Sequence, residues 1–150
     1  MNVRIFVAVA LTAFAVIATA LLLMHSGAAS APTESQFCEA LLADIRSVAP
    51  IDARECGLIP LGVARAEAIA CANASIATKS AFWVAFQERG EDSIVWQVVF
   101  GDTGGPLKSL SFDAQPFFDA GNQIKRHLSV GVCSNLAFNE SGPSAIRCTL

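Results

Sequence analysis

The chain has 150 residues, with 10 Lys and Arg against 13 Asp and Glu, and a formal net charge of −3. This slightly acidic balance excludes nucleic-acid binding driven by bulk charge, which needs a dense basic face. Apolar residues make up 53% of the chain and are most concentrated near its amino terminus. The remainder is too rich in Ile, Leu, Val and Phe for a disordered protein, and its length supports one domain with a real core but not two.

The amino-terminal segment has the order of regions that export requires. Arg4 is followed by an uncharged apolar run at residues 5–24 and then by small residues, as in a signal peptide. We expect cleavage to leave a mature start at Ala29 or Ser30. The apolar run is also long enough to cross a bilayer as one helix. Residues 1–29 are therefore predicted to be a signal peptide or an uncleaved membrane anchor.

Both alternatives place residues 30–150 in the periplasm or outside the cell, touching the membrane only through residues 5–24 if the leader is retained. Cysteine usage fits such an oxidising compartment. All five cysteines lie in the exported part: Cys38, Cys56, Cys71, Cys133 and Cys148. An odd number leaves at least one thiol without a partner in the chain.

One disulfide follows from spacing. The midpoint between Cys133 and Cys148 is also the midpoint of the turn at residues 139–142, so a hairpin centred there places the two cysteines opposite each other. We therefore predict a Cys133–Cys148 bridge. The other pairing stays open: Cys38 with Cys56 in one arrangement, and Cys71 with Cys133 in a rival one.

Two helices are expected first. Thr33 and Gln36 have the spacing of a capping box, and apolar residues then recur at helical spacing, predicting a helix over 33–48. Pro50 ends it, and residues 51–60 are expected to form a polar connector. An alanine-rich segment at 61–74 predicts a second helix with a small-residue face.

After Thr78 the apolar period changes from 3.6 to 2, which predicts strands. They are expected at about 82–86, 94–100, 107–112, 128–132 and 145–149, with a loop at 114–123. Short turns between successive strands make neighbours antiparallel. The prediction is an α+β fold: an export leader, then two N-terminal helices packed on one face of a four- to five-stranded antiparallel meander, in a single small domain at 30–150.

The segment Asp102-Thr103-Gly104 follows an apolar strand and resembles the Asp-Thr-Gly motif of retroviral-type aspartic peptidases. The resemblance implies a dimer in which two such aspartates meet, share a proton and activate water. Another interpretation of the same residues is a tight strand connection, because Gly, Asp, Thr and Pro are the residues that such a turn needs.

Trp83 lies on the strand face opposite to Phe82 and Val84. If the helices cover the Phe82 face, Trp83 is exposed and forms a candidate binding surface. If the first helix covers Trp83, it belongs to the core. His127 has no second histidine after the leader to share a metal ion, and is expected to be a surface residue.

These patterns favour an exported, non-enzymatic binding or structural domain that recognises a protein or small ligand through its sheet. We assign no catalytic, metal-binding or cofactor-binding residues. The alternatives are a dimeric aspartic-type peptidase using Asp102 and a membrane-tethered accessory subunit.

Overall fold

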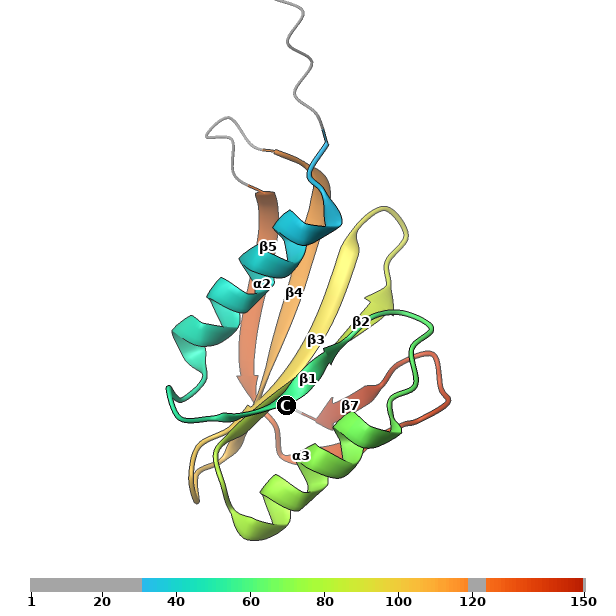
Figure 1. Ribbon diagram of the computed structural model, residues 1–150. Helices are drawn as coiled ribbons and strands as arrows, with labels where there is room; N and C mark the ends of the chain where they lie inside the picture. Colours follow the sequence, from blue (N-terminus) through green and yellow to red (C-terminus); the bar gives the residue numbers. More distant parts are fainter. Residues whose placement is uncertain (1–30, 119–123, 150) are drawn as a thin grey trace, which may run out of the picture. The chain divides into compact units, whose positions relative to one another are not determined.

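A computed structural model describes residues 31–118 and 124–149, and the predicted leader at 1–29 lies outside these residues. The described chain has an α+β architecture (Figure 1). Its helices and strands are α2 Glu34–Val48, β1 Arg54–Ile59, α3 Ala66–Thr78, β2 Phe82–Arg89, β3 Ile94–Gly101, β4 Leu107–Phe118, β5 Ile124–Val132, β6 Asn135–Phe138 and β7 Ile146–Thr149.

The main sheet has five strands in the order β1-β2-β3-β4-β5. β1 pairs with β2 in parallel, and the other neighbours are antiparallel. The prediction of a purely antiparallel meander is therefore wrong. Residues 51–60, expected to be a connector, contain β1, and α3 is the crossover that a parallel pair requires. Gly57, with φ of 122°, lies where the β1 register shifts between Glu55 and Leu58.

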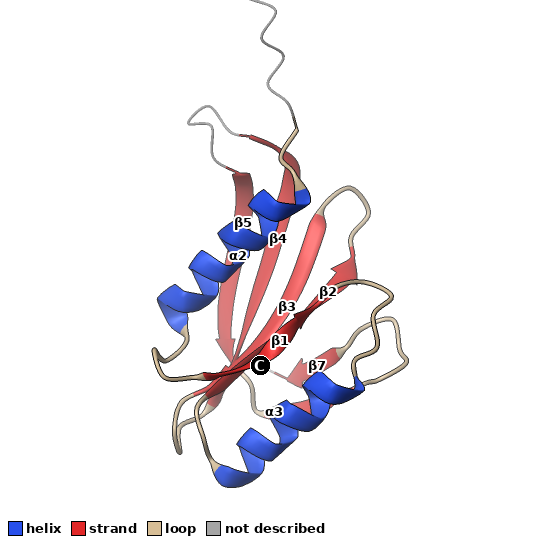
Figure 2. Cartoon of the chain, in the orientation of Figure 1, coloured by secondary structure: helices blue, strands red, loops and turns tan. Residues whose placement is uncertain are grey.

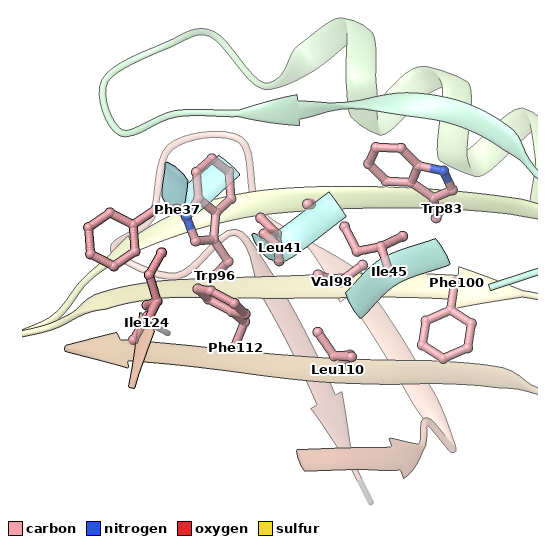
Figure 3. Close-up of a cluster of buried hydrophobic side chains, with 12 residues drawn as sticks. Phe37, Leu41, Ile45, Trp83, Trp96, Val98, Phe100, Leu110, Phe112 and Ile124 are labelled. Carbon is pink, nitrogen blue, oxygen red and sulfur yellow. The ribbon is translucent and has the colours of Figure 1, made fainter. Parts of the chain in front are cut away.

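Helix α2 covers one face of the sheet, called here the α2 face. Thr33 caps the helix: its side chain accepts a hydrogen bond from the Gln36 backbone N–H, and the Gln36 side chain accepts one from the Thr33 N–H. Phe37, Leu41 and Ile45 form a buried stripe at i, i+4 and i+8. Figure 3 shows this stripe packed on side chains of the sheet.

Helix α3 lies on the opposite face, called here the α3 face (Figure 2). The prediction that both helices are N-terminal and cover one face is wrong, since β1 comes between them in the chain. The alanines of α3 do allow close packing: Ala68 and Ala72 are buried beside Ile69. They pack with Phe82, Val84 and Phe86 of β2.

The β6–β7 hairpin packs beside α3 on the same face, where the rings of Phe86 and Phe138 lie 6.2 Å apart. The sequence predicted that strand 128–132 pairs with the last strand. Instead β5 pairs with β4, and β6, which was not predicted, pairs with β7. Cys133, directly after β5, is bridged to Cys148 of β7.

The second disulfide joins Cys56 of β1 to Cys71 of α3. Both pairings considered from the sequence, Cys38 with Cys56 and Cys71 with Cys133, are therefore wrong, and Cys38 is the free cysteine. The sequence pattern did not show β1, so it could not show that a strand and its crossover helix bring these two residues together. Two disulfides fit an oxidising, extracellular or periplasmic environment.

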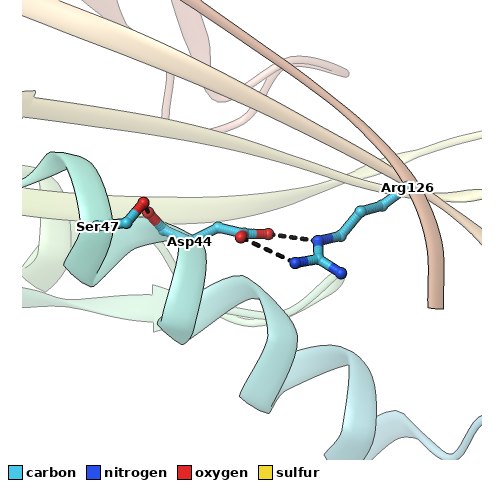
Figure 4. A network of polar contacts seen from close by, with 3 residues as sticks. All are labelled: Asp44, Ser47 and Arg126. Carbon is cyan, nitrogen blue, oxygen red and sulfur yellow. Dashed lines mark hydrogen bonds and ion pairs between the residues drawn. The ribbon is translucent and has the colours of Figure 1, made fainter. Parts of the chain in front are cut away.

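Strand β4 runs to Phe118, through part of the segment expected to be a loop. An ion pair links its neighbour β5 to α2: Arg126 donates from Nε to Asp44 Oδ2 at 2.7 Å and from Nη2 to Asp44 Oδ1 at 3.1 Å (Figure 4). The Asp44 side chain is only 12% exposed. Two parallel hydrogen bonds from one guanidinium fix the orientation of the helix over the outer strands.

Candidate functional site

The α3 face changes character across the sheet. Residues opposite each other in adjacent antiparallel strands share a face, so the register defines rows of side chains. One row, from β2 to β5, is Phe86, Gln97, Ser111 and Ser129. The next row is Val84, Val99, Ser109 and Gly131. Each row begins with an apolar side chain on β2, under α3 and the hairpin, and ends with polar or small residues on β4 and β5.

The polar part of these rows forms a groove of about 330 Å³. We call it the serine groove, after Ser109, Ser111 and Ser129, and it also includes Gln97. Gln97 Nε2 donates to Ser111 Oγ at 3.3 Å. Ser129 is exposed, while Ser109 and Ser111 are half-buried. Hydroxyl and amide groups both donate and accept hydrogen bonds, so the serine groove can bind either donor or acceptor groups of a ligand.

The β6–β7 hairpin supplies one wall of the serine groove through Ser144, Ile146 and Cys148. Glu88 of β2 anchors this wall: its Oε1 accepts from Ser144 Oγ at 2.6 Å and from the Ala145 backbone N–H at 3.2 Å. At the far end of β7, the disulfide between Cys148 and Cys133 attaches the wall to the end of β5. The wall is therefore fixed to the sheet by an anchored carboxylate and a covalent bond.

Other hollows also lie on the described residues. The first, of about 240 Å³, is lined by charged and polar residues of β4 and β5: Asp113, Gln115, Lys125, Arg126 and His127. Two more lie elsewhere. One, of about 460 Å³, is lined only by residues of the hairpin at 137–147, so the main sheet does not set its shape. The other, of about 130 Å³, lies between the end of α3 and the β3–β4 turn. The serine groove is instead built on four strands of the main sheet, which hold side chains more precisely than a single hairpin does.

Trp83, the candidate binding residue, is 6% exposed and packs with Ile45 and Phe100 on the α2 face (Figure 3). It therefore offers no open surface. The interpretation in which α2 covers it agrees with this placement. His127 is exposed on β5, opposite Asp113 of β4 in the register.

Asp102 lies in the β3–β4 turn, where its Oδ2 accepts from Lys108 Nζ at 2.9 Å. The Asp102 side chain is 42% exposed. Gly104 has φ of 68°, and the Gly105 N–H donates to the Asp102 carbonyl at 3.1 Å. This geometry is that of a tight strand connection, in which glycine supplies the left-handed backbone conformation.

Cys38 lies half-buried on α2, outside the serine groove. Burial, and to a smaller extent the nearby Glu34 carboxylate, raises the pKa of its thiol. A raised pKa lowers the thiolate fraction at neutral pH, which makes a poor nucleophile. No group of three or more His, Cys, Asp or Glu within residues 31–118 and 124–149 is placed to hold a metal ion.

The sequence reasoning missed the serine groove, although the chain carried a signal for it. Ser109 and Ser111 alternate with Leu110 and Phe112, so one side of this strand is polar wherever the strand is placed. That Ser129 lies beside Ser111 depends on the β4–β5 register. A pattern within one strand cannot specify which residues its neighbour places opposite.

No family model, curated protein or solved structure that was compared with this chain matches it. In the described part of the chain, no helix is long and apolar enough to span a membrane.

Proposed function

We propose that the protein is an exported, non-enzymatic binding domain that holds a neutral ligand, rich in hydroxyl or amide groups, in the serine groove. One observation carries the proposal: the α3 face changes from apolar to hydrogen-bonding side chains at the edge of the β6–β7 hairpin, leaving Gln97, Ser111 and Ser129 in one open row. The volume lies within the range of small-molecule sites, roughly 300 to 1,000 Å³.

The chemistry of the lining selects for an uncharged ligand. Glu88 is the charged residue of the groove, and its Oε1 is already occupied by Ser144 and the Ala145 N–H. The remaining polar groups are neutral hydroxyls and one amide, which pair with hydroxyl or amide groups at little desolvation cost. Ile146 and Gly131 add a small apolar surface. This mixture suits a saccharide or another ligand with closely spaced neutral polar groups.

We also propose that residues 1–29 direct export. The two disulfides support an oxidising destination. Amino-terminal sequencing of the exported protein distinguishes the two forms of the leader. A start at Ala29 or Ser30 shows a cleaved signal peptide and a released domain. An intact amino terminus shows an anchor, and thus a membrane-tethered subunit with the domain outside.

Ligand binding is tested by amide chemical-shift mapping with two neutral disaccharides, cellobiose and diacetylchitobiose, as probes. We expect at least one of them to shift the amides of the serine groove. Ser111→Trp fills the groove and is expected to weaken that binding by about tenfold or more, equivalent to about 1.4 kcal/mol. Ser35→Trp, on the exposed first turn of α2, is the matched control. Groove amides that respond to neither probe, or equal binding by both variants, contradict the proposal.

A further inference from the structure

Strand β5 is an edge of the main sheet. In the described structure this nine-residue strand pairs with β4 alone, and the pairing is continuous from Arg126 to Val132. An edge strand presents unpaired backbone N–H and C=O groups, and proteins usually protect such edges with charges, proline or bulges. From Leu128 to Val132, β5 contains none of these protecting features. This stretch is therefore open to pairing with another strand.

The same stretch carries exposed apolar side chains on the α2 face. Leu128, Val130 and Val132 are 40%, 53% and 56% exposed. Their register partners on β4 are Phe112, Leu110 and Lys108, which places all three on the same face as the α2 core. We call these three residues the apolar stripe of β5. An alternating apolar stripe beside an unpaired backbone is typical of a strand that pairs with a partner.

The backbone of the apolar stripe points outward. The Cys133 N–H donates to the Leu107 carbonyl at 2.8 Å, so this residue faces β4. In an antiparallel ladder the hydrogen-bonded positions alternate along each strand. Gly131 and Ser129 therefore also bond toward β4, while Val130 and Leu128 direct their N–H and C=O groups away from it. The residues with exposed apolar side chains are thus those whose backbone hydrogen-bonding groups point away from β4.

The sequence of β5 is complementary to itself when reversed. Residues 125–127 are basic and residues 128–132 are uncharged. Antiparallel pairing about a two-fold axis at Ser129 places Leu128 opposite Val130 of the second copy, and the bulky His127 opposite its Gly131. It also keeps the two basic ends apart. Parallel pairing aligns those basic ends and adds like-charge repulsion.

We propose that two copies of this chain pair through β5 in antiparallel orientation, about a two-fold axis near Ser129. The pairing joins the two main sheets into one continuous sheet and provides partners for the outward backbone groups and the apolar stripe. It also brings together the two copies of Ser129 on the α3 face, so that the two serine grooves meet. The pairing does not rest on the proposed ligand, because its argument uses only the edge of β5.

The first test is the association state. The full chain is expressed with its leader, so that the host processes it, and the exported form is analysed by sedimentation velocity over a range of concentrations. We expect a reversible dimer that Val130→Lys converts to monomer, because an edge lysine opposes strand pairing. Val63→Lys is the matched control: Val63 is 51% exposed but lies outside β5. Circular dichroism checks that both variants fold.

The second test locates the interface. In a Cys38→Ser background, Ser129→Cys is expected to give a covalent dimer under mild oxidation, because residues opposite each other in antiparallel strands have Cβ atoms about 4.5 to 5.5 Å apart. Ser80→Cys is the control, because Ser80 is exposed and lies two residues before β2, outside β5. A monomeric wild-type protein at all concentrations overturns the proposal. So does a dimer that survives Val130→Lys, or a Ser129→Cys variant that cross-links no more than the control.

Discussion

The inner strands β2 and β3 and the outer strands β4 and β5 belong to one sheet but differ in how they are covered. Helix α2 packs on one face of both the inner strands and β4. The inner strands also have α3 with the β6–β7 hairpin on the other face, and their residues from Val98 to Phe100 are almost wholly buried. On the outer strands the α3 face is left to the serine groove, and the apolar stripe of β5 is exposed. The comparison separates the buried part of the sheet, which stabilises the fold, from the open part in which we propose that a ligand binds.

The largest expected effect tests this division within a single row. Phe86 and Ser129 belong to the same row on the α3 face, one fully buried and the other exposed. Phe86→Ala is expected to cost about 3 to 5 kcal/mol of unfolding free energy, because it removes a buried ring and leaves a cavity. Ser129→Ala is expected to change that free energy by no more than about 0.5 kcal/mol. Urea denaturation of both variants measures the difference, and similar losses contradict the division.

A smaller effect is expected from removing the disulfide that holds the wall of the serine groove. The Cys133→Ala/Cys148→Ala variant loses a bridge with a sequence separation of 15, which stabilises by about 3 kcal/mol in the chain-entropy model. We expect amide hydrogen exchange to increase mainly in β6 and β7, with little change in β2 and β3. The Cys56→Ala/Cys71→Ala variant, with the same separation, is the matched control. Equal loosening of β6 and β7 in both variants shows that the hairpin is not held by its own bridge.

The smallest effect concerns Cys38 on α2, the helix that packs on the α2 face of the main sheet. Because burial and then Glu34 raise the pKa of this thiol, less thiolate is present at neutral pH and alkylation is slow. Labelling by iodoacetamide at pH 7.5 is expected to be slower in the folded protein than in urea. Glu34→Gln removes the smaller cause, lowers the pKa and speeds labelling modestly. A folded protein labelled as fast as the unfolded chain, across the pH range, contradicts this pKa direction.

The sequence by itself determined the features that depend on residues close together in the chain. The capping box at Thr33 and the stripe of Phe37, Leu41 and Ile45 predicted α2 to within a residue, since a helix is specified by contacts three and four residues apart. The β2–β3 hairpin was predicted for the same reason, from alternation and a short polar turn. The α+β class followed from these local periods.

Only the tertiary structure decided how the elements combine. The bulged edge strand β1 has too little alternation to be recognised, and without it neither the parallel pair, the Cys56–Cys71 bridge nor the position of α3 on the opposite face could be inferred. The serine groove likewise exists because register brings together residues from strands distant in sequence. The alternation of side chains along a strand determines which residues share a face of the sheet. Which helix or hairpin covers that face is decided by the burial of apolar area across the whole fold.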